Sequence, residues 1–174
     1  PNIVIDEQGD PWMSFGSFWG GIKMRKLDAA TGKLSTTDTK LYSLASRPRS
    51  AELPGAIEAP AIVRREGYYY LFVSFDFCCR GVDSTYNIRV GRSKSVTGPY
   101  LDRENKDMMQ GGGTLVLSGG KRWRGPGHCT ILRDPAGDKL VYHAYDADAR
   151  GASTLRITPI VWEAGWPTVS VSDQ

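Results

Sequence analysis

The residue in this chain whose setting best suits chemistry is a single carboxylate, Glu58, in the run GAIEAP at residues 55–60. Its close sequence neighbours are small or apolar, and no Lys or Arg lies among them. A carboxylic acid in such surroundings is poorly solvated, which favours its neutral form. A glutamic acid that keeps its proton near neutral pH is the proton donor needed to cleave a glycosidic bond. The alternative is an ordinary glutamate that points from a loop into water.

One glutamate is not a mechanism, because a second carboxylate must act as base or nucleophile. The sequence alone does not select that partner. In GSFWGG, residues 16–21, Ser17, Phe18 and Trp19 lie at a strand end beside glycines, which allow a ligand to approach the backbone closely. Aromatic rings suit sugar faces, and the alternative is that both rings belong to the core. From the residues alone, His128, in RGPGHC, is interpreted as a hydrogen-bonded histidine in a loop.

The elements that must position these residues are strands. Short β-rich runs alternate with turns rich in Gly, Asp and Pro, and no run of ten or more residues carries a helical apolar stripe. The predicted runs lie at residues 2–6, 11–18, 20–28, 61–67, 68–77, 86–93, 113–118, 129–134, 139–146 and 154–162.

A loose repeat joins these runs into larger units. Residues 10–27, 67–93 and 137–162 each read as a turn, an aromatic strand and a second strand. Repeats of several antiparallel strands at such a period suggest propeller blades, with a β-sandwich as the alternative. The innermost strand of each blade sends side chains toward a central channel, where a ligand pocket forms. Three such units do not close a ring.

Composition excludes several other classes of protein. The chain has 174 residues, and its net charge of +3 is scattered, with no basic block, so nucleic acid is not an expected partner. No apolar run approaches the ~18 residues of a membrane span. The three cysteines, Cys78, Cys79 and Cys129, do not have the spacing of a disulfide scaffold or a zinc site.

The chain contains, in this order, the motifs PNIVIDEQGDPWMSFGSFWGGI, GAIEAP, CCRGVDSTYNIRVGRSKSVTGPY, GGGT, GPGH and LVYHAYD. This ordered set resembles the endo-α-1,5-L-arabinanases of glycoside hydrolase family 43 over essentially the whole chain. The resemblance implies a five-bladed β-propeller, of which residues 1–174 would be roughly the C-terminal three blades. It also implies a secreted enzyme that hydrolyses arabinan with inversion. The alternatives are an exo-acting arabinofuranosidase or xylosidase of the same fold, and a noncatalytic carbohydrate-binding propeller fragment.

The resemblance also assigns roles to individual residues. Glu58 falls on the general acid, and Ser17, Phe18 and Trp19 fall near the sugar subsites. His128 falls on a histidine that binds an axial cation, commonly calcium, held mostly by waters. The family's pKa-tuning aspartate would immediately precede Pro1, with the general base further upstream. We therefore expect these two acids on an N-terminal fragment of the same protein, separated by a break at an Asp-Pro bond.

Two further expectations concern His143 and the vicinal cysteines. His143 lies within an alternating strand and is expected to be structural. Cys78 and Cys79 are expected to be buried thiols rather than a strained vicinal disulfide.

Overall fold

The computed structural model describes residues 1–49 and 55–170, and within these ranges the fold is all-β. The only helical elements among them are three short 3-10 turns, η1 (Gly81–Asp83), η2 (Met108–Gln110) and η3 (Ala147–Ala149). The predicted all-β class is therefore confirmed. None of the helical elements in the described ranges has the length and apolar character required to cross a membrane.

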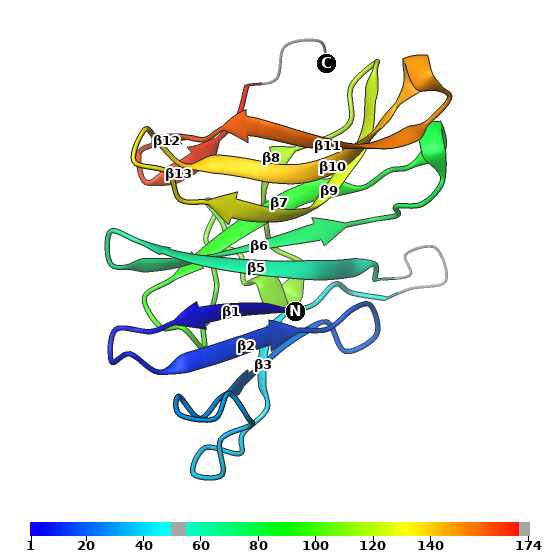
Figure 1. Cartoon of the computed structure of the whole chain (residues 1–174). Helices are drawn as coiled ribbons and strands as arrows, with labels where there is room; N and C mark the ends of the chain where they lie inside the picture. Colours follow the sequence, from blue (N-terminus) through cyan, green and yellow to red (C-terminus); the bar gives the residue numbers. More distant parts are fainter. Residues whose placement is uncertain (50–54, 171–174) are drawn as a thin grey trace.

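Three antiparallel sheets follow one another along the chain and lie one above another in Figure 1. The first contains β1 (Asn2–Ile5), β2 (Pro11–Phe15), β3 (Ile22–Lys26) and β4 (Tyr42–Ala45). The second contains β5 (Ile57–Arg65), β6 (Tyr68–Phe75), β7 (Asn87–Ser93) and β8 (Thr114–Leu117). The third contains β9 (Trp123–Leu132), β10 (Lys139–Asp146) and β11 (Ala152–Pro159), and the hairpin of β12 (Val161–Glu163) and β13 (Trp166–Thr168) follows it.

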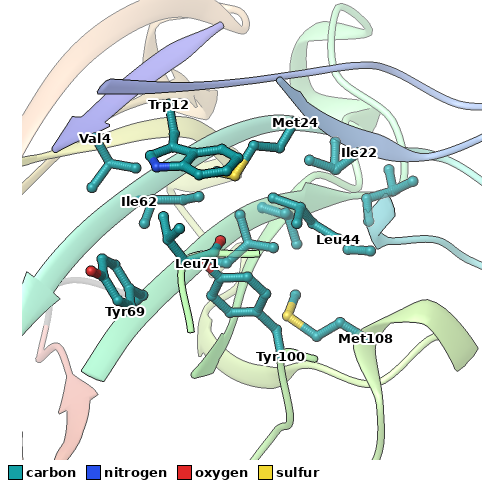
Figure 2. Close-up of a cluster of buried hydrophobic side chains, with 14 of the residues drawn as sticks. Val4, Trp12, Ile22, Met24, Leu44, Ile62, Tyr69, Leu71, Tyr100 and Met108 are labelled. Carbon is teal, nitrogen blue, oxygen red and sulfur yellow. The ribbon is translucent and has the colours of Figure 1, made fainter. Parts of the chain in front are cut away.

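The middle sheet separates two apolar cores, because the side chains of β6 alternate between its two faces. Side chains alternate between the faces of a strand. Tyr69, Leu71 and Val73 therefore enter the core shared with the first sheet, while Tyr70 and Phe72 enter the core shared with the third. Figure 2 shows the first of these cores, where Trp12 and Met24 pack against Ile62 and Leu71. A strand buried on both faces is apolar at nearly every position, as this one is.

The sequence repeats correspond to the second and third strands of each sheet. Residues 10–27 hold β2 and β3, residues 67–93 hold β6 and β7, and residues 137–162 hold β10 and β11. The first strand of each sheet packs on the next, β1 against β5 and β5 against β9. Three sheets that enclose two cores are not a two-layer sandwich. Because β1 packs on β5 and β5 on β9, candidate residues from successive sheets lie close together.

Strands β5 and β9 begin four and six residues earlier than the sequence indicated. The predicted runs began at Ala61 and Cys129, but β5 begins at Ile57 and β9 at Trp123, so Glu58 and His128 lie in strands and not in loops. Both are edge strands of their sheets, where proline is tolerated, and each carries a bulge that absorbs the proline or glycine run. Strand β4 had no counterpart among the predicted runs.

Candidate active site

Glu58 is positioned by a β-bulge in β5. Glu58 lies opposite Ser74 of β6, whereas Ala61 lies opposite Phe72, so β5 holds one extra residue in this interval. Ala59 takes up the excess with a φ of 55°, in the left-handed region. A bulge bends its strand and redirects the neighbouring side chain. Ala59 and Pro60, which resembled loop sequence, therefore form the bulge that orients the Glu58 side chain.

The carboxylate of Glu58 is half-buried and is held by two hydroxyl groups. Tyr86 donates a short hydrogen bond to Oε1, and Ser17 Oγ donates one of 2.9 Å to Oε2. Both donors are neutral, and the described part of the chain shows no other hydrogen bond to this carboxylate. The interpretation of Glu58 as a solvated loop residue is wrong, because both of its oxygens are engaged within the protein.

Tyr86 is buried, and its position is fixed on several sides. Its ring packs so closely on Gly127 of β9 that a Cβ there would lie 1.7 Å from the ring. His143 of β10 stacks on the same ring, with centroids 5.9 Å apart. Burial, and next the hydrogen bond to Glu58, raise the pKa of the Tyr86 hydroxyl far above its ordinary value. Tyr86 is therefore a fixed, neutral donor.

The loop that carries Ser17, Phe18 and Trp19 contacts Glu58 and the start of β5, and the predicted contact of these residues with sugar stays a prediction. The backbone N–H of Phe18 donates to the carbonyl of Ile57 at 2.7 Å, which ties the β2–β3 loop to the start of β5. Phe18 lies 6.3 Å from Phe77, measured between ring centroids. Trp19 is 74% exposed, so this ring is not a core residue. The loop therefore joins the start of β5 and carries an exposed indole two residues after Ser17.

His128 lies in β9 at a second bulge, with a φ of 51°. Its backbone N–H donates to Ser74 Oγ at 2.8 Å, and its side chain is exposed. Ser74 is fully buried and lies opposite Glu58, so this serine links the bulge of β9 to the strand position that faces Glu58. Glu58 and His128 are thus brought to the same region by matching distortions of β5 and β9.

His143 is the second histidine of this region. Burial lowers the pKa of His143, electrostatic interaction with His128 lowers it further, and Glu58 opposes both. Its Nε2 atom is buried without a hydrogen-bond partner among the described residues. His143 is therefore a neutral ring that supports Tyr86, which agrees with its predicted structural role.

The donors around His128 do not by themselves form a calcium site. Calcium prefers six to eight oxygen ligands. Within residues 1–49 and 55–170, no three side chains of His, Cys, Asp or Glu gather as a metal-binding group. A calcium ion held by His128 and waters stays a prediction, and no chemical step below depends on it.

The vicinal cysteines are thiols, as expected. Cys78 is half-buried, and burial, with its hydrogen bond to Cys79, raises the pKa of the Cys78 thiol to about 11. Cys79 is exposed, so the expectation that both are buried is wrong. The backbone N–H of Cys79 donates to the Tyr145 hydroxyl at 2.8 Å, and its φ of 66° turns the side chain outward.

Sequence comparison identifies the family. The profile of the family described as "Glycosyl hydrolases family 43" matches residues 1–167. The chain belongs to glycosyl hydrolase family 43. This family 43 chain is 51% identical over 168 residues to the "Extracellular endo-alpha-(1->5)-L-arabinanase 1" of Bacillus subtilis strain 168, covering 97% of this chain and 49% of that protein. It is 46% identical over 176 residues to the "Extracellular exo-alpha-(1->5)-L-arabinofuranosidase ArbA" of Cellvibrio japonicus, covering 97% of this chain and 50% of that protein.

Solved structures give the same assignment. An α-L-arabinanase from Cellvibrio cellulosa, complexed with arabinohexaose, superposes with a TM-score of 0.90 at 45% identity over 98% of this chain and 56% of that one. A family 43 endo-arabinanase from Bacillus licheniformis superposes with a TM-score of 0.88 at 55% identity, over 96% of this chain and 55% of that one. The chain spans about half the length of the curated relatives. The resemblance found in the sequence is confirmed at the level of the family.

Two residues of the candidate site, Tyr86 and Ser74, were not indicated by the sequence. Tyr86 precedes Ile88 and Val90 in an alternating run, which favours a core position, and Ser74 lies within an apolar strand. The useful signal was Ser74 itself, a polar residue on the face of β6 that otherwise buries Tyr70 and Phe72. A buried hydroxyl needs a partner.

Proposed function

We propose that this chain is part of an inverting endo-enzyme that hydrolyses α-1,5-arabinofuranosidic bonds in arabinan, with Glu58 as the general acid. The observation that carries the proposal is the carboxylate of Glu58, held by two neutral hydroxyls in a family 43 chain. The relative named an endo-arabinanase and the arabinohexaose complex of another relative support the substrate class.

The hydrogen bonds indicate which oxygen of Glu58 carries the transferable proton. A carboxylate accepts on both oxygens, whereas the acid form must donate from one of them. Tyr86 is buried and directed at Oε1, but Ser17 is exposed, and its hydroxyl can rotate to accept from a protonated Oε2. In the acid form the proton therefore lies on Oε2. It passes from there to the leaving glycosidic oxygen, and Glu58 returns to the carboxylate that both hydroxyls stabilise.

Inversion also needs a base that activates water on the opposite face of the sugar. In the described ranges no Asp or Glu hydrogen-bonds to Glu58. We assign the base and the acid-tuning aspartate to an N-terminal part of the same protein. In this proposal the three sheets are the C-terminal three blades of a five-bladed propeller, and residues 1–174 are the C-terminal part of that single domain.

The outer faces of the stack support this assignment. Val4 points into the first core, so Ile3 and Ile5 point away from it, and they are 49% and 52% exposed. At the other end of the stack, Leu155 and Ile157 of β11 are 68% and 55% exposed (Figure 1). Apolar side chains on both terminal sheets suit burial by further blades. Because the curated relatives above are named extracellular, we also propose that the protein is secreted.

The central test is Glu58→Gln in the protein that contains this chain together with its N-terminal part. The amide keeps the shape but removes the proton, so hydrolysis of linear arabinan should fall by roughly two to four orders of magnitude. An aryl arabinoside with a good leaving group should lose less, since its departure needs little protonation. Glu104→Gln, an exposed glutamate of the turn after β7, is the control. Equal losses on both substrates contradict the assignment.

The products of the unmodified protein separate the competing functions. Early release of mixed oligosaccharides indicates endo action, and release of one short product from the start indicates the exo-acting alternative. Inversion is read from the anomer first formed, by NMR. Binding of arabino-oligosaccharide without turnover by the complete protein identifies a noncatalytic module and overturns the proposal.

A further inference from the structure

A second pocket lies at the opposite end of the middle sheet from Glu58. It has a volume of about 450 Å³, and its walls include Tyr68, Arg92, Lys94, Asp102, Arg103 and Trp166. Tyr68 begins β6, whereas Ser74, opposite Glu58, lies near its end. At about 3.3 Å per residue, the two places are roughly 20 Å apart along the strand. The pocket is therefore separate from the candidate active site.

Arg92 is held in a fixed position at this pocket. Its guanidinium lies between the rings of Tyr68 and Trp166, 4.5 Å from each centroid. One nitrogen, Nη1, donates to the carbonyl of Gly165 at 2.9 Å, and the Tyr70 hydroxyl donates to the same carbonyl at 2.7 Å. A guanidinium carries five N–H donors. A pre-positioned guanidinium with donors to spare suits the planar, two-oxygen geometry of a carboxylate.

The charge around the pocket is positive. Lys94 lies 5.1 Å from the ring of Tyr68, and Arg103 lies 5.9 Å from the ring of Trp166. In the part of the chain that the structure describes, Arg92, Lys94 and Arg103 form no ion pair. The acid in the lining, Asp102, accepts from the backbone N–H groups of residues 104, 106 and 113, at 3.1, 2.8 and 2.9 Å. Its oxygens are therefore used by the turn, and the three cations face the pocket.

We propose that this pocket binds a carboxylated sugar, such as the uronate unit of an acidic glycan. The volume suits a sugar rather than a bare inorganic anion, and Ser95 and Asn105 add hydroxyl and amide groups to the wall. The carboxylate pairs with Arg92, and Lys94 and Arg103 lie close enough to add long-range attraction. The choice of a sugar over other organic anions rests on the proposed glycan-degrading function. The pocket would hold an acidic glycan at a place separate from Glu58.

Binding of trigalacturonate, measured by calorimetry and NMR on the full chain, tests the site. We expect saturable binding that weakens as salt is added, because the attraction is ionic. The double variant Lys94→Gln, Arg103→Gln keeps Arg92, and it should weaken binding by about tenfold, since the attraction of two exposed positive charges is lost. Lys40→Gln is the matched control, because Lys40 is also exposed and lies 4.7 Å from a tyrosine ring, that of Tyr42. Arg92→Lys should lose the two-point contact and weaken binding as well.

Three outcomes overturn the proposal. They are no binding of trigalacturonate, binding that the double variant leaves unchanged, and binding of inorganic sulfate as tight as that of trigalacturonate, which reveals a simple anion site. Glu58→Gln should leave the affinity for trigalacturonate unchanged. The experiment can therefore disprove binding at this pocket without disproving the catalytic role of Glu58, and the reverse also holds.

Discussion

The hydroxyl of Tyr86 and the carboxylate of Glu58 form the central pair of the site, with Tyr86 donating to Oε1. The pair links the second sheet to the third, because the Tyr86 ring packs on Gly127 of β9 and on His143 of β10. A buried tyrosine that stays neutral stabilises the anionic carboxylate more than the acid. Tyr86 is thus a positioning residue for Glu58, and it favours completion of proton transfer.

Tyr86→Phe tests this role, because the ring is kept and only the donor is lost. We expect kcat on linear arabinan to fall by about tenfold, the usual order for losing a hydrogen bond to a charged group. The high-pH limb of the activity profile should move to higher pH, since the anionic form loses a stabilising partner. Tyr100→Phe is the control, as Tyr100 is buried and donates to the Val96 carbonyl far from Glu58. A loss of stability with an unmoved pH profile contradicts the positioning role.

Ser17→Ala distinguishes two roles for one hydroxyl. The sequence indicated a substrate contact, whereas the structure shows a hydrogen bond to Glu58 Oε2. If Ser17 holds the proton-bearing oxygen, kcat should fall several-fold while KM stays nearly constant, as for an interaction made with the catalytic group. A rise in KM alone identifies a substrate contact instead. The control is Thr36→Ala, which also removes an exposed hydroxyl and should affect neither constant.

The sequence was sufficient for the all-β class, because alternation is a local feature. The GAIEAP run is also local, and it singled out Glu58, whose catalytic role stays a proposal. The sequence did not predict that Glu58 and His128 lie in strands. A run of Pro or Gly usually indicates a loop, and a bulge cannot be recognised without its partner strand. The bulges at Ala59 and His128 depend on pairing with β6 and β10, which are contacts between separate segments. Tyr86 was missed for the same reason, since its partner lies 28 residues away in the sequence.

His143 predicts how stability depends on pH. Burial lowers the pKa of His143 from its ordinary value of 6.5, so the unfolded chain binds this proton more readily than the folded protein does. Above the unfolded pKa both states are neutral here, and His143 contributes no slope. As the pH falls below about 6.5, the unfolded state gains the proton first, and the free energy of unfolding decreases.

The measurement is the urea midpoint at about pH 7.5 and about pH 5.5, on either side of the unfolded pKa. His143→Phe keeps a ring against Tyr86 but cannot titrate, so its midpoint should fall less between the two conditions. Carboxylates affect both proteins alike and cancel in the comparison. Equal falls in the two proteins show that His143 does not titrate differently on folding.

The last prediction concerns the ion expected at His128. A ligand that binds only the folded state raises the melting temperature by mass action. If calcium binds at His128, added calcium should raise the melting temperature of the unmodified protein, a chelator should reverse the rise, and His128→Ala should abolish it. Thr130→Ala, two residues along β9 and also exposed, should keep the response. The backbone N–H of residue 128 still reaches Ser74 in His128→Ala, so the bulge itself is retained. A melting temperature that changes with neither calcium nor chelator shows that no exchangeable ion binds at this site. His128 would then be an exposed histidine on a bulge that serves the backbone contact to Ser74.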